Sequence, residues 1–368
     1  MQDYTFTSES VCSGHPDKVC DQISDGIVDA VLSKDPRGRV AMEALVTENK
    51  IVLAGEVTTS AKVDFEAITR QVIKDLDYTD SRFRFTHESS LDMYIHEQSP
   101  EIAAGVDEEG AGDQGMMFGY ACHETPELMP LPITLAHRMA QKIDDVRKSK
   151  VIAYLRPDGK TQVSVRYENG KPVAITSVVI AVPHEEEKQL KEVRNSLYRE
   201  VVSPVLAAYG FTFPEDQVIV NGTGIWHIGG PASDTGLTGR KIVVDGYGGY
   251  ARVGGGAFSG KDPTKVDRSG AYAARFLAKN IVAKGLAERA EVRLAYFIGA
   301  KKPLMQDVET FGTEKVLREH IQKFMHEILD TSVAGILKTL NLRTPIYKNT
   351  AAYGHFGRSE FPWEKIVA

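Results

Sequence analysis

The sequence predicts an α+β protein made of three units that repeat the same order of elements. Its 368 residues exceed one ordinary hydrophobic core, so two or three domains are expected. A helix, a β-hairpin and a second helix follow one another three times, in copies that start near residues 16, 132 and 266. No residue-level identity links the copies, so the repeat is one of pattern. Hairpins that alternate with helices favour sheets covered by helices on one face.

The first unit begins with a helix at Pro16, because proline at the first helical position has no N–H to lose and a pre-set φ. The alternating segments VAMEALVT and IVLAGEVTT follow, and residues 48–50 between them form a hairpin signal. A second helix is predicted over residues 63–76.

The other two units follow the same order. The second has a helix over 131–148, the strands VIAYL, TQVSVRY and KPVAITSVVIAV, and a helix near 184–202. The third has a helix starting at Pro263 with Asp262 as its cap, the strands EVRLAYFIG and LMQDVET, and a helix over 314–329.

The composition is that of a soluble globular protein, with 42% hydrophobic and 26% charged residues and a net charge of −6. No apolar run approaches the ~20 residues that cross a bilayer, and the first residues lack the plan of a secretory signal. Cys12, Cys20 and Cys122 are too few and wrongly spaced for a zinc site or a disulfide framework. We therefore expect a cytoplasmic protein that binds no membrane and, given its acidity, no nucleic acid.

Residues 254–270, GGGAFSGKDPTKVDRSG, are the stretch most suggestive of a ligand. Glycine N–H groups turned around an anion, followed by a helix N-terminus, are typical of phosphate sites. Residues 240–284 carry nine Lys and Arg against three Asp, so basic charge gathers here. Residues 255–261 fit the start of a P-loop, but Asp262 stands where that motif needs Ser or Thr, so we reject a P-loop. The alternative is a glycine-rich loop before a solvated basic helix.

The helix after these glycines presents four cations at helical spacing, Lys265, Arg268, Arg275 and Lys279. The like charges in such a row repel one another unless an anion or an acidic partner lies alongside them. Arg275 and Lys279 are expected on an ordinary solvated face. Lys265 and Asp267, in the first turn beside the glycines, are better candidates for a site.

Residues 14–18, GHPDK, place an imidazole, a carboxylate and an ammonium at a helix start. Asp17 is suited to Mg²⁺, a hard cation that prefers oxygen ligands and substrate phosphates. His15 is suited to donate a hydrogen bond to an oxygen that becomes negative as a leaving group departs. The alternative is a capped helix with its charges in water. Two polar, glycine-rich segments, 99–115 and 221–241, are interpreted as site loops.

Five motifs, in this order, resemble those of the S-adenosylmethionine synthetase (methionine adenosyltransferase) family. They are GHPDK at 14–18, GAGDQGMMFGYA at 110–121, GLTGRK at 236–241, GGGAFSGKDPTKVDRS at 254–269 and AAYGHFGR at 351–358, the last followed by FPWEK. Together they span nearly the whole chain.

The resemblance implies an α+β fold of three pseudo-threefold-related α/β domains, each a mainly antiparallel sheet with helices on one face. We place these domains at 1–99, 100–229 and 230–368, with a mobile lid at 99–111 that closes over the site and excludes water. The resemblance also implies a homodimer with active sites between the subunits, usually paired into a homotetramer.

The implied reaction joins ATP and L-methionine. The methionine sulfur attacks C5′ of ATP and displaces triphosphate, which is then hydrolysed to pyrophosphate and phosphate. Sulfur needs no base, so the demanding step is the stabilisation of the departing triphosphate, which calls for cations and metal. The implied cofactors are two Mg²⁺ per site and K⁺.

The resemblance assigns roles to the matching positions of this chain. The catalytic set is His15, Lys160, Arg240, Lys241 and Lys261. The ATP contacts are these five together with Asp158, Ile225, Trp226, Asp234 and Ala257. The methionine contacts are Glu56, Gln98, Asp113, Asp234 and Lys265. Asp17 and Asp267 are the Mg²⁺ ligands, and Glu43 is the K⁺ ligand. On local pattern alone, Glu43 and Glu56 are outward carboxylates on strands, and 112–115 and 156–160 are turns.

The chain departs from many bacterial members of this family. Ile225 and Trp226 stand where those members have Arg and Phe, so Trp226 is able to stack on adenine but an Arg contact is missing. The segment between Gln98 and Gly110 is also shorter. Cys12, three residues before His15, is a candidate for oxidation sensitivity.

Three other classes of protein stay open as alternatives. An ATP-dependent kinase or ligase with the same phosphate cradle would release ADP or AMP. A non-catalytic nucleotide-binding relative would be expected to lose His15, Asp17 and Lys261, which this chain keeps. A nucleic-acid binder would show salt-dependent affinity for oligonucleotides.

Overall fold

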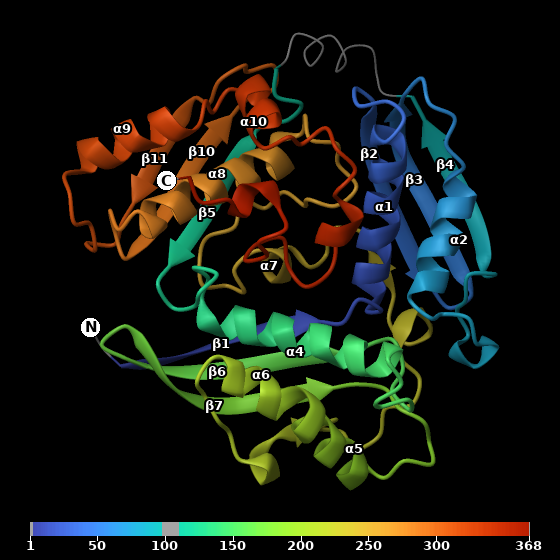
Figure 1. The fold of residues 1–368 in the computed structure, drawn as a ribbon. Helices are drawn as coiled ribbons and strands as arrows, with labels where there is room; N and C mark the ends of the chain where they lie inside the picture. Colours follow the sequence, from blue (N-terminus) through green and yellow to red (C-terminus); the bar gives the residue numbers. More distant parts are fainter. Residues whose placement is uncertain (1–2, 98–109, 368) are drawn as a thin grey trace.

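The computed structural model describes residues 3–97 and 110–367, and its strands form three sheets (Figure 1). The first sheet has the order β4 (Ser90–His96), β3 (Lys50–Thr58), β2 (Arg39–Thr47) and β9 (Gly236–Leu237). The second has the order β1 (Tyr4–Val11), β6 (Lys160–Glu168), β7 (Lys171–Ala181) and β8 (Ile219–Val220). The third has the order β11 (Met305–Glu309), β10 (Arg289–Tyr296) and β5 (Gly115–Cys122). Among these strands, β3–β4 and β7–β8 pair in parallel and the other neighbours are antiparallel.

Each sheet packs against one long helix, most of whose side chains are buried. These helices are α1 (Pro16–Leu32), α4 (Leu131–Lys148) and α8 (Val266–Ala283), and they surround the short α7 (Ile242–Asp245) in Figure 1. Shorter helices complete the layers, namely α2 (Phe65–Asp75) on α1, α6 (Ser203–Ala208) beside α4, and α9 (Arg318–Ile328) and α10 (Val333–Thr339) on α8. The helix α5 (Leu190–Leu197) contacts β8. The predicted α+β class, with three mainly antiparallel sheets and their helices, is confirmed.

The three sheets exchange strands along the chain. β1 pairs over its whole length with β6 of the second sheet, whereas its neighbour in sequence, α1, packs on the first sheet. β5 pairs with β10 of the third sheet, and the two-residue β9 pairs with β2 of the first. Strand pairing therefore crosses the predicted boundaries near 99 and 229 and ties the units together.

Most elements with a local signal lie where the sequence predicts them. α1 begins at Pro16, α4 covers 131–148, and β2 and β3 form the predicted hairpin. Two predictions for the second unit are wrong. The segment VIAYL at 151–155 forms turns instead of a strand, and the helix predicted near 184–202 begins at Leu190 and passes through a π-helical turn into α6.

The predicted start of α8 at Pro263 is also wrong, because the helix begins at Val266 with Lys265 as N-cap residue. The Asp262 carboxylate does not cap α8. Its oxygens accept hydrogen bonds from Val40 N at 2.8 Å and from Thr264 N at 3.0 Å. Asp262 therefore fastens the glycine-rich loop to β2.

The face of α8 that was predicted to be solvated is buried. Arg275 is fully buried, and its Nε and Nη2 donate to the two carboxylate oxygens of Glu364 at 3.0 and 2.9 Å. Lys279 Nζ donates to the same carboxylate at 2.7 Å. Arg268 pairs with Asp25, with nitrogen–oxygen distances of 2.7 and 2.6 Å. Acidic partners thus lie alongside the row of cations.

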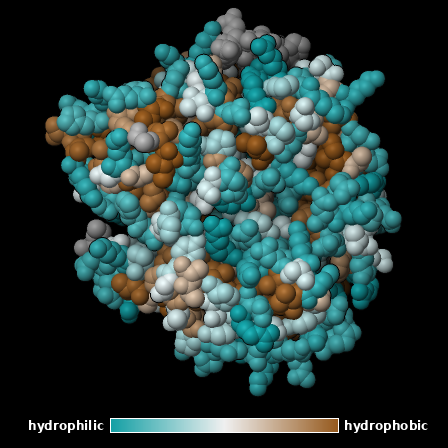
Figure 2. Space-filling model, in the orientation of Figure 1, coloured by the Kyte–Doolittle hydropathy of each residue, from teal (hydrophilic) through white to brown (hydrophobic). Residues whose placement is uncertain are grey.

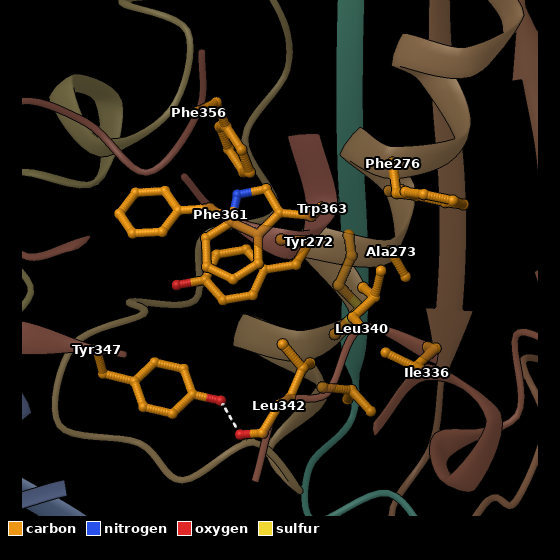
Figure 3. Close-up of a cluster of buried hydrophobic side chains, with 14 of the residues drawn as sticks. Tyr272, Ala273, Phe276, Ile336, Leu340, Leu342, Tyr347, Phe356, Phe361 and Trp363 are labelled. Carbon is orange, nitrogen blue, oxygen red and sulfur yellow. Dashed lines mark hydrogen bonds between the residues drawn. The ribbon is translucent and has the colours of Figure 1, made fainter. Parts of the chain in front are cut away.

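The C-terminal segment covers this part of α8 with aromatic rings (Figure 3). Trp363 stacks on Tyr272 with ring centroids 3.6 Å apart, and its indole N–H donates to His355 O at 2.8 Å. Tyr347 lies in the same cluster and donates to the backbone carbonyl of Leu342. The motif AAYGHFGR and the following FPWEK therefore serve packing. The face in Figure 2 is largely hydrophilic with small hydrophobic patches, and no helix among the described residues is long and apolar enough to span a membrane.

Candidate active site

A row of aspartates on α1 holds the two glycine-containing loops in place. Asp17, Asp21 and Asp25 follow one another every four residues, so they share one face of the helix. Their carboxylates accept backbone N–H groups of Leu237, Gly239 and Gly260 at 3.0, 2.9 and 2.9 Å. The loops at 236–241 and 254–262 are therefore bound to the same helix, and both also pair with the edge of β2.

His15 caps the N-terminus of α1. Its Nδ1 accepts the backbone N–H of Asp17 at 3.2 Å, so the ring proton is carried by Nε2. Nε2 is buried and has no partner in the described structure. Burial lowers the pKa of His15 to about 3, and the ammonium of Lys241 adds to this shift. The imidazole is thus a neutral hydrogen-bond donor at physiological pH.

Asp17 lies between the helix start and the loop at 236–241. One carboxylate oxygen accepts Leu237 N and the other pairs with the ammonium of Lys241. Burial alone would raise the pKa of Asp17, but the hydrogen bonds from Lys241 and Leu237 hold it below its ordinary value. Gly236 is required at this contact, because a Cβ there would lie 2.2 Å from the backbone of Pro16.

The predicted turn at 156–160 packs against the same helix start. A Cβ on Gly14 would lie 2.3 Å from the carbonyl oxygen of Pro157. Asp158 is buried and accepts the N–H groups of Gly159 at 2.7 Å and Gly230 at 2.8 Å. Burial raises the pKa of the Asp158 carboxyl to about 6, although those N–H groups oppose the shift. Lys160 is exposed beside this turn, and its charge contributes to the low pKa of His15.

These contacts bring five predicted residues together, and we call them the histidine group: His15, Asp17, Asp158, Lys160 and Lys241. Cys12 is attached to the turn of Asp158, because its backbone N–H donates to Gly159 O at 2.9 Å. The Cys12 side chain is fully buried, and this burial raises the pKa of its thiol well above the ordinary value. Because oxidation proceeds through the thiolate, the structure does not favour the predicted sensitivity of Cys12.

A second cluster, which we call the glycine-loop group, forms around residues 254–267. Lys261 Nζ lies 2.5 Å from Asp267 Oδ2, and a Cβ on Gly256 would lie 2.2 Å from the carboxyl carbon of Asp267. Lys265 is largely buried and pairs with Asp262. The loop runs beside β2, where Met42 N donates to Gly260 O at 2.9 Å. Asp113 lies next to this loop, because Gly112 N donates to Thr264 O at 3.3 Å.

Glu43 and Glu56 lie on the face of the first sheet that α1 and α2 leave uncovered. They line a hollow of about 660 Å³ together with residues 93–96. Glu56 lies 3.2 Å from His96, and the nearby Tyr94 is 65% exposed. The uncovered face of the sheet therefore contains a hollow that is lined by carboxylates and by some apolar side chains.

The remaining predicted residues lie on the loops between these groups. Arg240, Asp234 and Ile225 are exposed, and Trp226 is half-buried, with its indole N–H donating to Ile228 O at 2.9 Å. Ala257 touches the loop at Gly239, where an added Cβ would lie 2.5 Å from the Cβ of Ala257. Gln98 and most of the predicted lid at 99–111 lie outside the described residues.

No hydrogen bond or ion pair within the described residues joins the histidine group to the glycine-loop group. Both are fixed to α1, yet each is internally paired: Lys241 with Asp17, and Lys261 with Asp267. Within residues 3–97 and 110–367, no set of three or more His, Cys, Asp and Glu side chains is arranged to hold a metal by itself. Mg²⁺ is commonly held by one or two carboxylates plus substrate phosphates and water. The single carboxylates of Asp17 and Asp267, each beside a lysine, fit that kind of site.

The row of aspartates was not predicted from the sequence. Asp21, Asp25 and Asp29 were not singled out, although their spacing from Asp17 is regular. Asp29 extends the row by accepting the N–H groups of Tyr347 and Lys348 at 2.8 and 2.9 Å. The signal was present as DQISDGIVD, which repeats Asp every four residues along the helix.

Comparisons with known proteins agree with this site. Three family models match in order, described as the N-terminal domain (residues 3–100), the central domain (108–226) and the C-terminal domain (228–365) of S-adenosylmethionine synthetase. A protein of Treponema denticola named S-adenosylmethionine synthase is 52% identical over 370 aligned residues, covering 98% of this chain and 95% of the relative. One of the same name from Desulforudis audaxviator is also 52% identical, covering 100% of this chain and 97% of the relative. The chain therefore belongs to the S-adenosylmethionine synthetase family.

Proposed function

We propose that this protein is a methionine adenosyltransferase that makes S-adenosylmethionine from ATP and L-methionine. The observation that carries the proposal is the buried Nε2–H of His15, which has no partner and lies among the cations Lys160 and Lys241. A neutral donor with two ammonium groups nearby suits an oxygen that becomes negative when a C–O bond breaks. His15 thus hydrogen-bonds the oxygen that leaves C5′ while the methionine sulfur attacks that carbon.

The departing triphosphate is held by cations from both groups. Lys160, Arg240 and Lys241 come from the loops around the histidine group, and Lys261 comes from the glycine-loop group. Lys241 and Lys261 are each paired with a carboxylate, so their ammonium groups are already oriented beside Asp17 and Asp267. Cleavage of the triphosphate to pyrophosphate and phosphate follows at the same cations.

Asp17 and Asp267 would each hold one Mg²⁺, and Glu43 would hold K⁺ on the uncovered face of the first sheet. The metal supplies charge neutralisation of the phosphate oxygens when it is bound. The protein's own part is to keep Asp17 ionised, as its lowered pKa supports, and to hold Asp267 beside Lys261.

The remaining residues recognise the two substrates. Asp158, Ile225, Trp226, Asp234 and Ala257 are proposed to contact the nucleoside part of ATP. Glu56, Gln98, Asp113, Asp234 and Lys265 are proposed to contact methionine. The ammonium of Lys265 suits the methionine carboxylate, and the carboxylates of Glu56 and Asp113 suit its amino group.

We also propose that the active site forms between two subunits of a homodimer, with pairs of dimers forming a homotetramer in the cytoplasm. Support comes from the absence of any described bond between the two groups and from the uncovered, partly apolar face that carries Glu43 and Glu56. In such a dimer, the histidine group of one subunit faces the glycine-loop group of the other.

Product analysis tests the proposed reaction. The purified protein is incubated with ATP, methionine, Mg²⁺ and K⁺, and the products are identified by mass spectrometry. The proposal predicts a sulfonium compound with pyrophosphate and phosphate in equal amounts, all greatly reduced without methionine or in a His15→Asn variant. Formation of ADP or AMP instead would identify a kinase or ligase and contradict the proposal.

A further inference from the structure

The loop over residues 221–228 is fastened at its start by Asn221. The short strand β8 pairs in parallel with β7, and the backbone N–H of Asn221 still donates to Ile180 O of β7 at 2.9 Å. At Asn221 the chain takes a left-handed conformation, with φ at 46°, and leaves the sheet. Its side chain is buried and continues the pairing, because Oδ1 accepts Val182 N at 2.8 Å and Nδ2 donates to Val182 O at 3.0 Å. The amide of Asn221 therefore replaces the backbone amide that a longer β8 would supply.

The segment that follows β7 also holds the middle of this loop. The backbone N–H of His184 donates to Trp226 O at 3.1 Å, and His184 O lies 3.1 Å from Nδ1 of His227. Because a carbonyl oxygen only accepts, Nδ1 of His227 carries the proton in this bond. Arg156, from the neighbouring turn, donates to His227 O. Trp226 is therefore held through its own carbonyl group and through both the ring and the carbonyl group of the next residue.

We call these contacts the loop clamp, which consists of Asn221, His227 and the backbone of His184. The indole of Trp226 is half-buried, and its N–H donates to Ile228 O at 2.9 Å. We propose that Asn221 and His227 are positioning residues, which hold the ring of Trp226 where it stacks on the base of ATP. This inference rests on the proposed function, because that function assigns the nucleoside to Trp226. The clamp acts through Trp226 and not by contact with the substrate.

The loop clamp should affect the binding of ATP more than the reaction itself. Residues 221–228 form turns and irregular structure, so their order depends on contacts such as those of the clamp. A loop that is ordered only when ATP binds loses conformational entropy at that step, and the apparent affinity falls. The base is remote from C5′, so its contact is equally strong in the ground state and in the transition state. Loss of the clamp should therefore raise the KM for ATP and leave kcat nearly unchanged.

Steady-state kinetics with ATP as the varied substrate test the role of Asn221. Asn221→Ala should raise the KM for ATP roughly tenfold, because two hydrogen bonds of the clamp are lost, and should change kcat by less than about twofold. Asn221→Gly should show the same rise, although glycine fits the left-handed conformation. The control is Asn169→Ala, because Asn169 has φ at 51° but is exposed in the turn between β6 and β7, and this variant should behave as wild type. A wild-type KM in Asn221→Gly would show that only the backbone conformation matters and would overturn the proposal, as would an unchanged KM in Asn221→Ala.

His227 offers a second pair of variants at a half-buried position, where a substitution disturbs the fold less than one at the buried Asn221. His227→Leu removes the Nδ1–H donor and should raise the KM for ATP by about fivefold. His227→Asn keeps an amide donor close to the position of Nδ1 and should restore most of the wild-type KM. Equal KM values for the two variants would overturn the role of His227, because they would show that the hydrogen bond to His184 O does not position the loop.

Tryptophan fluorescence gives a readout that does not depend on activity. The chain has two tryptophans, and Trp363 is fully buried, so acrylamide quenches mainly Trp226. Asn221→Ala should increase this quenching and shift the emission to longer wavelength, whereas Asn169→Ala should change neither. Equal quenching of Asn221→Ala and wild type would overturn the proposal, as would a failure of ATP to protect Trp226 in wild type.

The fluorescence measurement also separates this inference from the proposed function. A wild-type protein that forms no S-adenosylmethionine, but in which Asn221→Ala exposes Trp226 and ATP protects it, would refute the proposed function and leave the loop clamp in place. Normal synthesis of S-adenosylmethionine with an unchanged KM for ATP in Asn221→Ala would overturn the loop clamp alone.

Discussion

Glu364 tests how the C-terminal segment stabilises α8. Its carboxylate accepts hydrogen bonds from Arg275, Lys279 and the backbone of Gly357 at 2.7 to 3.0 Å. Glu364→Gln keeps the shape and one acceptor oxygen but leaves two buried cations without a counter-charge. Breaking a buried ion pair costs about 3–5 kcal/mol. For a chain of this length, that loss should lower the Tm by roughly 4–6 °C.

The assay is thermal unfolding followed by circular dichroism, with Glu360→Gln as the matched control. Glu360 is 59% exposed and lies 3.5 Å from Arg358, so its substitution should leave the Tm nearly unchanged. Equal Tm values for the two variants would refute the reasoning, because they would show that the buried carboxylate contributes no more than an exposed one.

The effect of Glu364 should also depend on pH. Burial alone would raise the pKa of this carboxyl, but Arg275 and then Lys279 hold it below its ordinary value. A depressed folded pKa means that the stabilisation is present above the ordinary glutamate pKa of about 4.3 and is lost as the pH falls through the folded pKa. The Tm difference between wild type and Glu364→Gln should therefore shrink on acidification. A difference that grows at low pH would contradict this sign.

Three substitutions test the site. Lys261→Met should lower kcat by an order of magnitude or more, since a preorganised charge contact stabilises the transition state by ~3 kcal/mol. A near-wild-type rate in steady-state kinetics would show that Lys261 is not part of the site. Asp17→Asn should shift the Mg²⁺ dependence of the rate to higher concentration, and an unchanged metal titration would rule out its role as a ligand. Gly256→Ala should reduce activity without unfolding the protein, because the new Cβ would lie 2.2 Å from the carboxyl carbon of Asp267. Gly222→Ala is the control, since its Cβ would meet no atom closer than 4.0 Å, and this variant should stay active.

Elements with short-range signals were predictable from the sequence. The proline start of α1, the amphipathic α4 and the β2–β3 hairpin each depend on residues close together in the chain. The motifs around His15 and Lys261 identified most of the candidate site for a similar reason, since each is a continuous segment. These segments are all attached to α1 through Asp17, Asp21 and Asp25. Only the three-dimensional structure shows this common attachment.

Features that depend on distant partners were not predictable. Arg275 was expected in solvent because its partner, Glu364, lies 89 residues away in the sequence. Likewise, β1 shows nothing locally that would direct it to β6 instead of the adjacent hairpin. The helix α8 begins at Val266 and not at the predicted Pro263, because Asp262 accepts a hydrogen bond from β2 instead of capping the helix. In each case a tertiary contact decided between two locally acceptable structures.

The central claim is that each active site combines the histidine group of one subunit with the glycine-loop group of its partner. Heterodimers of His15→Asn and Lys261→Met subunits, each variant carrying its own affinity tag, test it directly. Each variant alone should keep about a tenth of the wild-type activity or less, while the purified heterodimer contains one intact site and should recover about half of the wild-type activity. Heterodimers that stay as inactive as the parent variants would show that each subunit builds its own site, and would contradict the account.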